Sequence, residues 1–264
     1  MMDVNVTLQQ VIVIARQAGA AIMTVYAQGF DVQHKHDNSP LTQADLAAHD
    51  IIEAGLGQLV PELPVLSEES AVIPYATRRQ WDKYWLVDPL DGTREFIKRN
   101  GEFTVNIALI ENHRPVMGVV YAPALDLLFY ATEGQGAYKQ TGHNTPQPIK
   151  SRVYDAAQVT VAGSRSHAGE ELIRFLDRMG PHTLLSIGSS LKICLVAEGS
   201  ADVYPRLGPT SEWDTAAAQC VLHEAGGRLI DIDGDSFRYN HKESLLNPYF
   251  FAAGAGEHDW KQYL

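Results

Sequence analysis

The order of the apolar segments changes along this chain of 264 residues, and the change restricts the folds that it can adopt. Before about residue 150, several short runs have the apolar composition of strands, and the central ones, joined by brief turns, predict an antiparallel meander. The expected strands are 64–67, 84–87, 103–110, 116–121 and 127–130. After residue 150, runs of strand length and of helix length alternate, which favours an α/β arrangement. We therefore expect two layered halves, an α+β half at 1–150 and an α/β half at 151–264.

Helices are expected before the first strand and throughout the second half. Apolar residues three or four positions apart predict an amphipathic helix at 8–27. Thr42 stands three residues before Asp45 and matches a capping pair for a second helix, which should end near Val60 because Pro61 follows. In the second half the expected helices are 169–179, 190–198 and 213–225, and the expected strands are 159–162, 183–187, 202–204 and 228–232.

Acidic residues stand where the expected strands end and the expected helices begin. In the stretch WLVDPLDGTREF, Asp88 and Asp91 directly follow the apolar residues of a strand. Glu68 follows the first strand, while Asp45 and Asp214 lie in the first turns of two helices. Each has an ordinary explanation by itself, since aspartate caps helices and forms turns and glutamate is a common surface residue.

Taken together, these carboxylates indicate a metal site. A hard cation such as Mg²⁺ prefers several oxygen ligands in near-octahedral geometry. Two such ions, about 3.5–4 Å apart, can hold the attacking and leaving oxygens of a phosphoryl transfer. Asp88 and Asp91 supply two carboxylates at one turn, and the carbonyl of Leu90 between them can point the same way. Glu68 and Asp214 could complete the set.

The charge and composition of the chain exclude some classes of function. The formal net charge is −11 and the isoelectric point is about 5.3, so a nucleic acid polymer, which needs a basic surface, is not an expected partner. We find neither a signal-peptide pattern nor an apolar run of the roughly 18–20 residues that span a bilayer. The two cysteines, Cys194 and Cys220, fit buried free thiols in a reducing compartment. We therefore expect a cytoplasmic protein without a membrane span, and the oligomeric state is left open.

Three stretches of the chain resemble the inositol monophosphatase superfamily. They are SEES at 67–70, DPLDGTREF at 88–96 and EWDTAAAQCVLHEAGG at 212–227, and they occur in the order that the family has. The members of this superfamily are Mg²⁺-dependent, lithium-sensitive phosphatases. The resemblance, which covers essentially the whole chain, therefore implies a hydrolase with a layered αβαβα sandwich of the sugar-phosphatase type.

The resemblance also implies a role for each matching residue. The metal ligands, for two or three Mg²⁺ ions, would be Glu68, Asp88, the carbonyl of Leu90, Asp91 and Asp214. Thr93 and Asp45 match the pair that orients and activates the attacking water, since a carboxylate can accept a proton through a hydroxyl. The backbone of Gly92 and Thr93 would contact the substrate phosphate. Further substrate contacts would come from the metal ligands Glu68, Leu90, Asp91 and Asp214.

The second half carries another set of residues that could bind an anion. Ser189 and Lys192 lie in GSSLK, where small residues open a helix and leave N–H groups free, and Arg206 follows in DVYPRLG. Taken alone, the serine is equally typical of a helix cap, and the two cations are typical of a solvated surface. The stretch 188–214 nevertheless resembles one branch of the superfamily, the 3′(2′),5′-bisphosphate nucleotidases of the bacterial CysQ type.

This narrower resemblance implies a substrate with two phosphates. Ser189, Lys192 and Arg206 would hold the phosphate that is not cleaved, and His167 in AGSRSH would lie near the nucleotide. The implied reaction converts adenosine 3′,5′-bisphosphate (PAP) to AMP and phosphate, with 3′-phosphoadenosine 5′-phosphosulfate (PAPS), cleaved to APS, as a second substrate. Such an enzyme would serve sulfur metabolism, and a peripheral position at the cytoplasmic face of the inner membrane stays open for it.

Other functions share parts of this pattern. Inositol monophosphatase would use the same metal ligands without needing Ser189, Lys192 and Arg206 together, and fructose-1,6-bisphosphatase is an alternative within the same fold. A metal- and nucleotide-binding regulator without turnover is disfavoured, because Thr93 and Asp45 are both present.

Two further stretches look like metal sites but have simpler interpretations. His34 and His36 lie in a polar segment, and a role for them in metal binding is left open. The stretch DIDGD at 231–235 lacks the glutamate that a calcium-binding loop requires and is interpreted as a hairpin turn.

Overall fold

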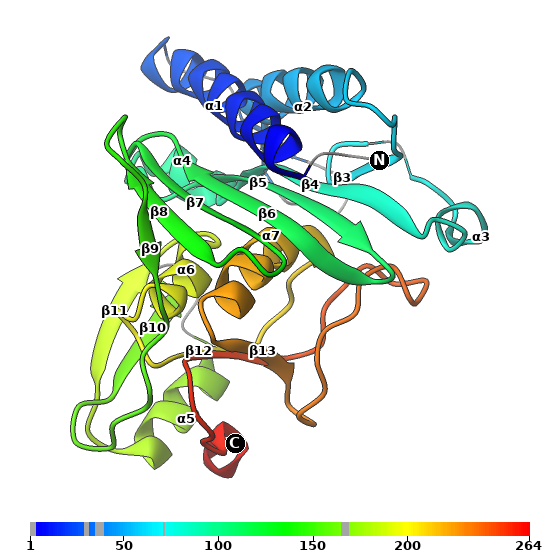
Figure 1. Cartoon of the computed structure of the whole chain (residues 1–264). Coiled ribbons are helices and arrows are strands. Elements are labelled where there is room, and N and C mark those ends of the chain that lie inside the picture. The colour runs from blue at the N-terminus through cyan, green and yellow to red at the C-terminus, as the bar shows by residue number, and fades with distance from the viewer. Residues whose placement is uncertain (1–3, 29–31, 35–39, 71, 165–168) are drawn as a thin grey trace.

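The helices and sheets of the protein stack in five alternating layers (Figure 1). The computed structural model describes residues 4–28, 32–34, 40–70, 72–164 and 169–264. The helices α1 (Val4–Gln28) and α2 (Gln43–Leu56) cover one face of a seven-stranded sheet. The helices α6 (Leu191–Ala197) and α7 (Glu212–Glu224) lie between this sheet and a five-stranded sheet, whose far face carries α5 (Glu170–Met179). The layered αβαβα sandwich expected from the sequence is confirmed.

The seven-stranded sheet contains the five expected strands, the central ones as an antiparallel meander, and two further strands. In sheet order they are β3 (Val65–Ser67), β4 (Lys83–Asp91), β5 (Thr104–Glu111), β6 (Arg114–Ala122), β7 (Leu127–Thr132), β8 (Ala137–Thr141) and β9 (Gln147–Ile149). The strands β3 and β4 pair in parallel, and every later neighbour pairs antiparallel. The sequence did not predict β8 and β9, because β8 is mostly half-buried and β9 mostly exposed, so neither shows a continuous apolar run.

The five-stranded sheet is mixed. Its order is β11 (Thr183–Ile187), β10 (Thr160–Ser164), β12 (Val203–Arg206), β14 (Phe250–Ala253) and β13 (Arg228–Asp231). The strand β10 pairs in parallel with β11 and β12, whereas β14 pairs antiparallel with β12 and β13. The sequence analysis missed β14, because four buried residues are too few to show a period. The shorter elements are β1 (Val32–His34), β2 (Pro40–Thr42), α3 (Tyr75–Arg78), α4 (Thr93–Ile97) and the 3₁₀-helix Trp260–Tyr263.

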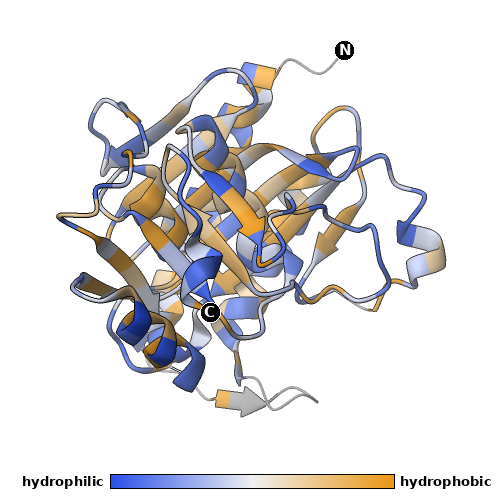
Figure 2. Cartoon of the chain, turned by 90° about the horizontal axis from the view of Figure 1, so that it is seen from below, coloured by the Kyte–Doolittle hydropathy of each residue, from blue (hydrophilic) through white to orange (hydrophobic). Residues whose placement is uncertain are grey.

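Three apolar clusters fill the spaces between the layers. One joins α1 and α2 to the seven-stranded sheet, a second surrounds α6 and α7, and a third joins the five-stranded sheet to α5 and the C-terminal segment. Figure 2 shows hydrophobic residues concentrated on the strands and helices in the middle of the molecule, with hydrophilic residues in the surrounding loops. The chain leaves the first sheet after β9 and enters the second at β10. A boundary between 1–150 and 151–264 stays a prediction, since the middle cluster takes residues from both ranges.

Small residues hold α7 closely against the first sheet. Ala216, Ala217 and Ala218 are all buried. On β6, Gly118 leaves room for the helix, because a Cβ atom at this position would lie only 2.2 Å from the carbonyl oxygen of Ala217. The backbone of α7 therefore packs directly on the sheet, and the first turn of the helix is fixed relative to the strands.

The helix α1 has the length and apolar composition of a helix that could cross a membrane. A core helix passes the same test, and the buried residues of α1 pack in the cluster shared with α2 and the first sheet. The sequence analysis predicted an amphipathic helix here and no membrane-spanning run, because polar residues such as Arg16 and Gln17 interrupt the apolar stretch. The absence of a membrane span stays a prediction.

Candidate active site

The strand β4 carries two of the expected metal ligands and ends in an irregular pairing. Asp88 lies opposite Asn106 on β5. Three residues further along β4, Asp91 lies opposite Thr104, which is only two residues from Asn106. Residues three apart on a regular strand point to opposite faces, and the extra residue of a β-bulge reverses this. The bulge therefore turns Asp88 and Asp91 toward the same side. Pro89 fits here because a bulge does not require its missing N–H.

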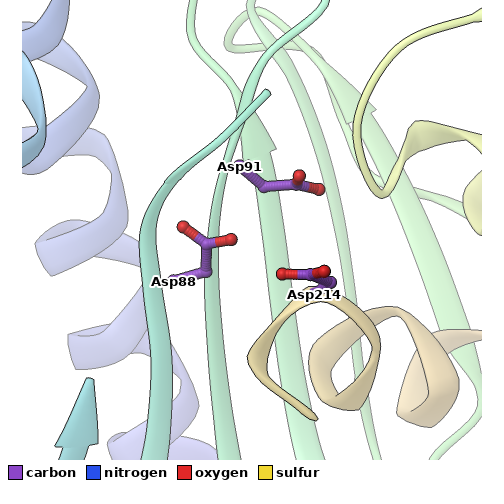
Figure 3. A group of neighbouring side chains, drawn as sticks. All are labelled: Asp88, Asp91 and Asp214. Atoms are coloured by element: carbon purple, nitrogen blue, oxygen red, sulfur yellow. The ribbon is translucent and has the colours of Figure 1, made fainter. Parts of the chain in front are cut away.

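Asp88, Asp91 and Asp214 form a compact carboxylate cluster (Figure 3). One oxygen of each lies within 4.8 Å of one oxygen of each of the others. Asp214 comes from the first turn of α7, and Figure 3 shows its carboxylate directed toward the two aspartates of β4. Two motifs that are more than a hundred residues apart in the sequence thus meet at one point.

Two of these aspartates also stabilise the local backbone. Asp88 Oδ1 accepts a hydrogen bond from the N–H of Leu90 at 3.0 Å. Asp214 Oδ2 accepts one from the N–H of Ser211, the N-cap residue of α7, at 2.9 Å. The turn and helix-cap explanations for these residues are therefore correct for one oxygen of each carboxylate. The second carboxylate oxygen of Asp88 and that of Asp214 remain available to the cluster.

Burial and mutual repulsion make the cluster electrostatically unfavourable by itself. Burial raises the pKa of Asp88 well above its ordinary value, and the charges of Glu68 and Asp91 raise it further. The pKa of Asp214 is raised by burial and then by Asp91 and Glu68. Asp88 Oδ2 is buried and has no hydrogen-bond partner among the described residues. A divalent cation would satisfy this oxygen and offset the charges, so the donor set fits Mg²⁺.

Asp45 reaches the site through Thr93. The hydroxyl of Thr93 donates a hydrogen bond to Asp45 Oδ1 at 3.3 Å and lies 3.4 Å from the carbonyl oxygen of Leu90. Asp45 Oδ2 accepts hydrogen bonds from both the N–H and the hydroxyl of Thr42, the N-cap residue of α2. The expected capping pair is confirmed. Asp45 and Thr93 are in contact as expected, and their catalytic role stays a prediction.

Two glycines let the segments around the site approach one another. Gly92 has a φ of 95°, and a Cβ atom there would lie 3.2 Å from the carbonyl oxygen of Glu102 and 3.4 Å from the Cβ of Ser189. At Gly188 a Cβ atom would lie 2.5 Å from the Cγ of Glu95. Both glycines therefore lie close against residues 95–103, where a side chain at either position would force a shift.

One cavity of about 310 Å³ contains most of the expected site residues. Those that line it are Glu68, Asp88, Leu90, Asp91, Gly92, Thr93, Ser189, Lys192, Arg206 and Asp214. Asp45 does not line the cavity but contacts it through the hydroxyl of Thr93. The remaining expected residue, His167, lies outside the described residues.

The cationic side of the cavity is formed by α6 and β12. Lys192 is buried, donates a hydrogen bond to the carbonyl oxygen of Ser189 at 2.6 Å and lies 5.4 Å from the ring centre of Tyr204. Burial lowers the pKa of Lys192 to about 8; the charge of Asp91 opposes this shift and that of Arg206 adds to it. Arg206 donates one hydrogen bond to the carbonyl oxygen of Pro209. The two cations therefore line the same cavity as the carboxylates.

Some residues at the site were not identified from the sequence. Ser190, Glu95 and Tyr204 also line the cavity. The family resemblance singled out Ser189 in the GSS stretch. Nothing in the sequence of two adjacent serines indicated that the hydroxyl of Ser190 also faces the site. Tyr204 looked like an ordinary strand residue, and only the fold places its ring beside Lys192.

Of the two other candidate metal stretches, the structure describes one fully. His36 lies outside the described residues, and His34 is described only as the last backbone position of β1. The stretch 231–235 is the expected turn, with Asp231 Oδ1 accepting hydrogen bonds from the N–H groups of Asp233 and Asp235.

Comparison with known proteins agrees with this geometry. The family model described as the inositol monophosphatase family matches residues 3–261. Among curated proteins, the chain is similar to the 3′(2′),5′-bisphosphate nucleotidase CysQ of Salmonella typhimurium, with 52% identity over 245 residues that cover 92% of this chain and 98% of that protein.

Solved structures show the same relationship. The chain is similar to the crystal structure of CysQ from Bacteroides thetaiotaomicron, a bacterial member of the inositol monophosphatase family, with a TM-score of 0.83 and 43% identity. That match covers 97% of this chain and 99% of the other. The extragenic suppressor protein suhB from Bartonella henselae is similar with a TM-score of 0.80 and 25% identity, covering 98% of this chain and 96% of that one.

Proposed function

The chain belongs to the inositol monophosphatase family, and from this premise we propose that it is a 3′(2′),5′-bisphosphate nucleotidase. It would hydrolyse the 3′-phosphate of adenosine 3′,5′-bisphosphate to give AMP and inorganic phosphate. The activity for which its relatives of more than 50% identity are named supports this proposal.

The observation that carries the proposal is that acidic and basic side chains line one cavity. Asp88, Asp91 and Asp214 line this cavity together with Lys192 and Arg206. A substrate with two separate phosphates needs one site where metal ions compensate the phosphate charge and a second site with fixed cations. Arginine suits the second site because its planar guanidinium can form two parallel hydrogen bonds to a phosphate. An inositol monophosphate would leave the second site without an anion.

The carboxylate cluster would hold the metal ions, with Glu68 and the carbonyl of Leu90 as further ligands. Bound Mg²⁺ would neutralise phosphoryl oxygens and acidify a water molecule. The number of ions, two or three, remains part of the proposal. The fixed positions of Asp88 and Asp214 on a strand end and a helix start provide ligands that need little reorganisation on binding.

Thr93 and Asp45 would activate the attacking water. The Thr93 hydroxyl already donates to Asp45 Oδ1, so its oxygen is oriented to accept a hydrogen bond from a water molecule in the cavity. A proton leaving that water can pass through the hydroxyl to Asp45, whose other oxygen is held by Thr42. The backbone N–H groups at Gly92 and Thr93 would contact the phosphate that is cleaved.

Direct attack by water is favoured over a covalent intermediate on a thiol. Both cysteines are buried, and burial raises the pKa of Cys194 and of Cys220 above the ordinary thiol value. A thiol of raised pKa is a poor nucleophile at neutral pH. Neither cysteine lines the cavity of the site.

The test is a comparison of phosphate release from three substrates by the purified protein with Mg²⁺. Adenosine 3′,5′-bisphosphate should be cleaved with a kcat/KM well above those for inositol 1-phosphate and fructose 1,6-bisphosphate, and EDTA should abolish the reaction. A preference for inositol 1-phosphate would contradict the assignment of the second phosphate site while leaving the metal site intact. Equal activity with and without EDTA would contradict the metal assignment.

Finer parts of the proposal can be tested in the same assay. Cleavage of PAPS to APS would add a second substrate, and inhibition by lithium is expected from the family.

The proposed location is the cytoplasm, where the enzyme would act on a soluble nucleotide.

A further inference from the structure

The hydroxyl of Ser190 lies among three polar groups from three other elements. Its oxygen is 2.7 Å from Asp91 Oδ2, 2.6 Å from the carbonyl oxygen of Asp214 and 2.9 Å from Asn106 Nδ2. Ser190 and Asn106 are 3% and 1% exposed, so water cannot easily replace these contacts. From this geometry we propose that Ser190 and Asn106 form a buried clamp that positions Asp91 against Asp214 for metal binding.

The donor and acceptor roles in the clamp follow from the chemistry of each group. The amide nitrogen of Asn106 can only donate, so it donates to the hydroxyl oxygen of Ser190. That oxygen has one proton, which can go only to the two remaining acceptors, the carboxylate of Asp91 and the carbonyl of Asp214. The hydrogen bond to the ionised carboxylate is the stronger of the two, because charge assists it.

The clamp connects the layers at the point where the metal cluster is assembled. Asp91 belongs to the end of β4, Asn106 to β5, Ser190 to the start of α6 and Asp214 to α7. Asn106 is also the cross-strand neighbour of Asp88, so its side chain lies on the same face of the sheet as that ligand. One hydroxyl therefore fixes the distance between a strand that supplies two carboxylates and a helix that supplies the third.

An ordinary structural role explains Ser190 less well. As the N-cap residue of α6 it could bond the free N–H groups of its own helix, but its side chain makes no cap hydrogen bond. Its hydroxyl is instead directed at Asp91 and at the Asp214 backbone. Groups that orient metal ligands in this way set metal affinity without touching the metal.

The test is a titration of metal-free protein with Mg²⁺ by calorimetry, for wild type and the variants Ser190→Ala, Asn106→Leu and the double variant. Each single variant should bind Mg²⁺ roughly 10–100-fold more weakly, the usual cost of losing a group that orients a metal ligand. The double variant should bind little more weakly than either single variant, because both changes break one unit. Thr132→Val is the matched control, since it removes a buried hydroxyl that has no hydrogen-bond partner among the described residues.

Several outcomes would overturn the clamp. Wild-type Mg²⁺ affinity in Ser190→Ala would do so, and so would losses in the two single variants that simply add in the double variant. If Ser190→Ala is unfolded at the assay temperature by circular dichroism, Asn106→Leu alone decides, because it keeps the hydroxyl.

The clamp rests on the proposed function only in assuming that the carboxylates bind a metal. Calorimetry needs no substrate, so its outcome is separable from that of the phosphate-release assay. A wild-type protein that binds Mg²⁺ but does not cleave the nucleotide would contradict the proposed activity and leave the clamp testable. A wild-type protein that binds no Mg²⁺ would overturn the clamp.

Discussion

The site aspartates combine a structural hydrogen bond with a contact to other residues of the site. Asp45 and Asp214 occupy equivalent positions in the first turns of α2 and α7, and each accepts a hydrogen bond from the N-cap N–H with Oδ2. For Asp45 the other oxygen accepts from Thr93, and for Asp214 the carboxylate joins the cluster with Asp88 and Asp91. A capping aspartate is thus already oriented before any ligand binds, which lowers the entropy cost of assembling the site.

At the same scale, Arg206 provides a test of the second phosphate site. Replacing Arg206 with alanine removes charge-assisted hydrogen bonds worth about 1.5–3 kcal/mol each. We expect KM for adenosine 3′,5′-bisphosphate to rise roughly 10–100-fold. KM for adenosine 3′-monophosphate, which keeps the phosphate that is cleaved but lacks the other, should change much less. Steady-state kinetics on both substrates measure the difference.

The control for this change is Arg228→Ala, which removes a guanidinium that bonds the carbonyl of Gly256 away from the site cavity. This variant should keep both KM values. If Arg206→Ala raises the two KM values equally, Arg206 supports the fold of β12 and does not bind the second phosphate.

Among the elements, α7 is held in close packing on both sides, because it lies between two sheets. Its run of alanines and the facing Gly118 allow the backbone of the helix to approach β6. The same helix delivers Asp214 to the metal cluster, so its depth in the sandwich sets the geometry of the site. Packing and function are therefore coupled at this element.

Gly118→Ala should show this coupling. The new methyl group would overlap the carbonyl of Ala217, and α7 and β6 would have to separate. Overpacking of this kind costs about 1–3 kcal/mol, which urea unfolding can measure. Because Asp214 would move with the helix, Mg²⁺ affinity should fall as well.

Gly208→Ala is a suitable comparison, since a Cβ atom there meets nothing within 4 Å. Its free energy of unfolding should stay close to that of the wild type. Equal stability of the Gly118→Ala and Gly208→Ala proteins would mean that the close contact between α7 and β6 relaxes without cost.

The elements also show what can be inferred from the sequence. The meander strands, β11 and the capped start of α2 follow from apolar periodicity and from Thr42 and Asp45, and the structure contains them. The site motifs could be identified because their carboxylates, each of which has an ordinary explanation alone, together indicate a metal site and match the motifs of a known family. The role of Asn106 could not, because a single polar residue in a strand acquires a partner only through pairing with β4 and contact with α6.

On the scale of the whole molecule, the site lies where the two sheets and the middle helices meet. The first sheet supplies Asp88 and Asp91, and the middle layer supplies Asp214 and Lys192. Arg206, on the second sheet, completes the cavity. A change that loosens the packing between layers would therefore separate the carboxylates from the cations, so binding of metal and substrate should stabilise the whole sandwich.

This architecture predicts how the stability of the metal-free protein depends on pH. Asp88 has a raised pKa in the folded state, so the native protein holds its proton more tightly than the unfolded chain does. The stability that this proton provides is lost as the pH rises from the ordinary carboxyl value of 3.8 through the raised pKa. The side chain of Asp88→Asn is neutral at every pH and loses no such stability. In EDTA the melting temperature of the variant should therefore exceed that of the wild type by a margin that grows from pH 4 to pH 8.

Saturating Mg²⁺ should reverse this order. Ligand at 100 times its Kd stabilises a folded protein by about 2.7 kcal/mol, and only the wild type keeps the complete ligand set. Melting temperatures measured with EDTA and with Mg²⁺ across the pH range test both statements. If metal-free wild type and Asp88→Asn melt together at pH 8, repulsion among the carboxylates is not a cost to the fold. The cavity would then need no cation to stabilise it, and the charge argument for the metal site would fail.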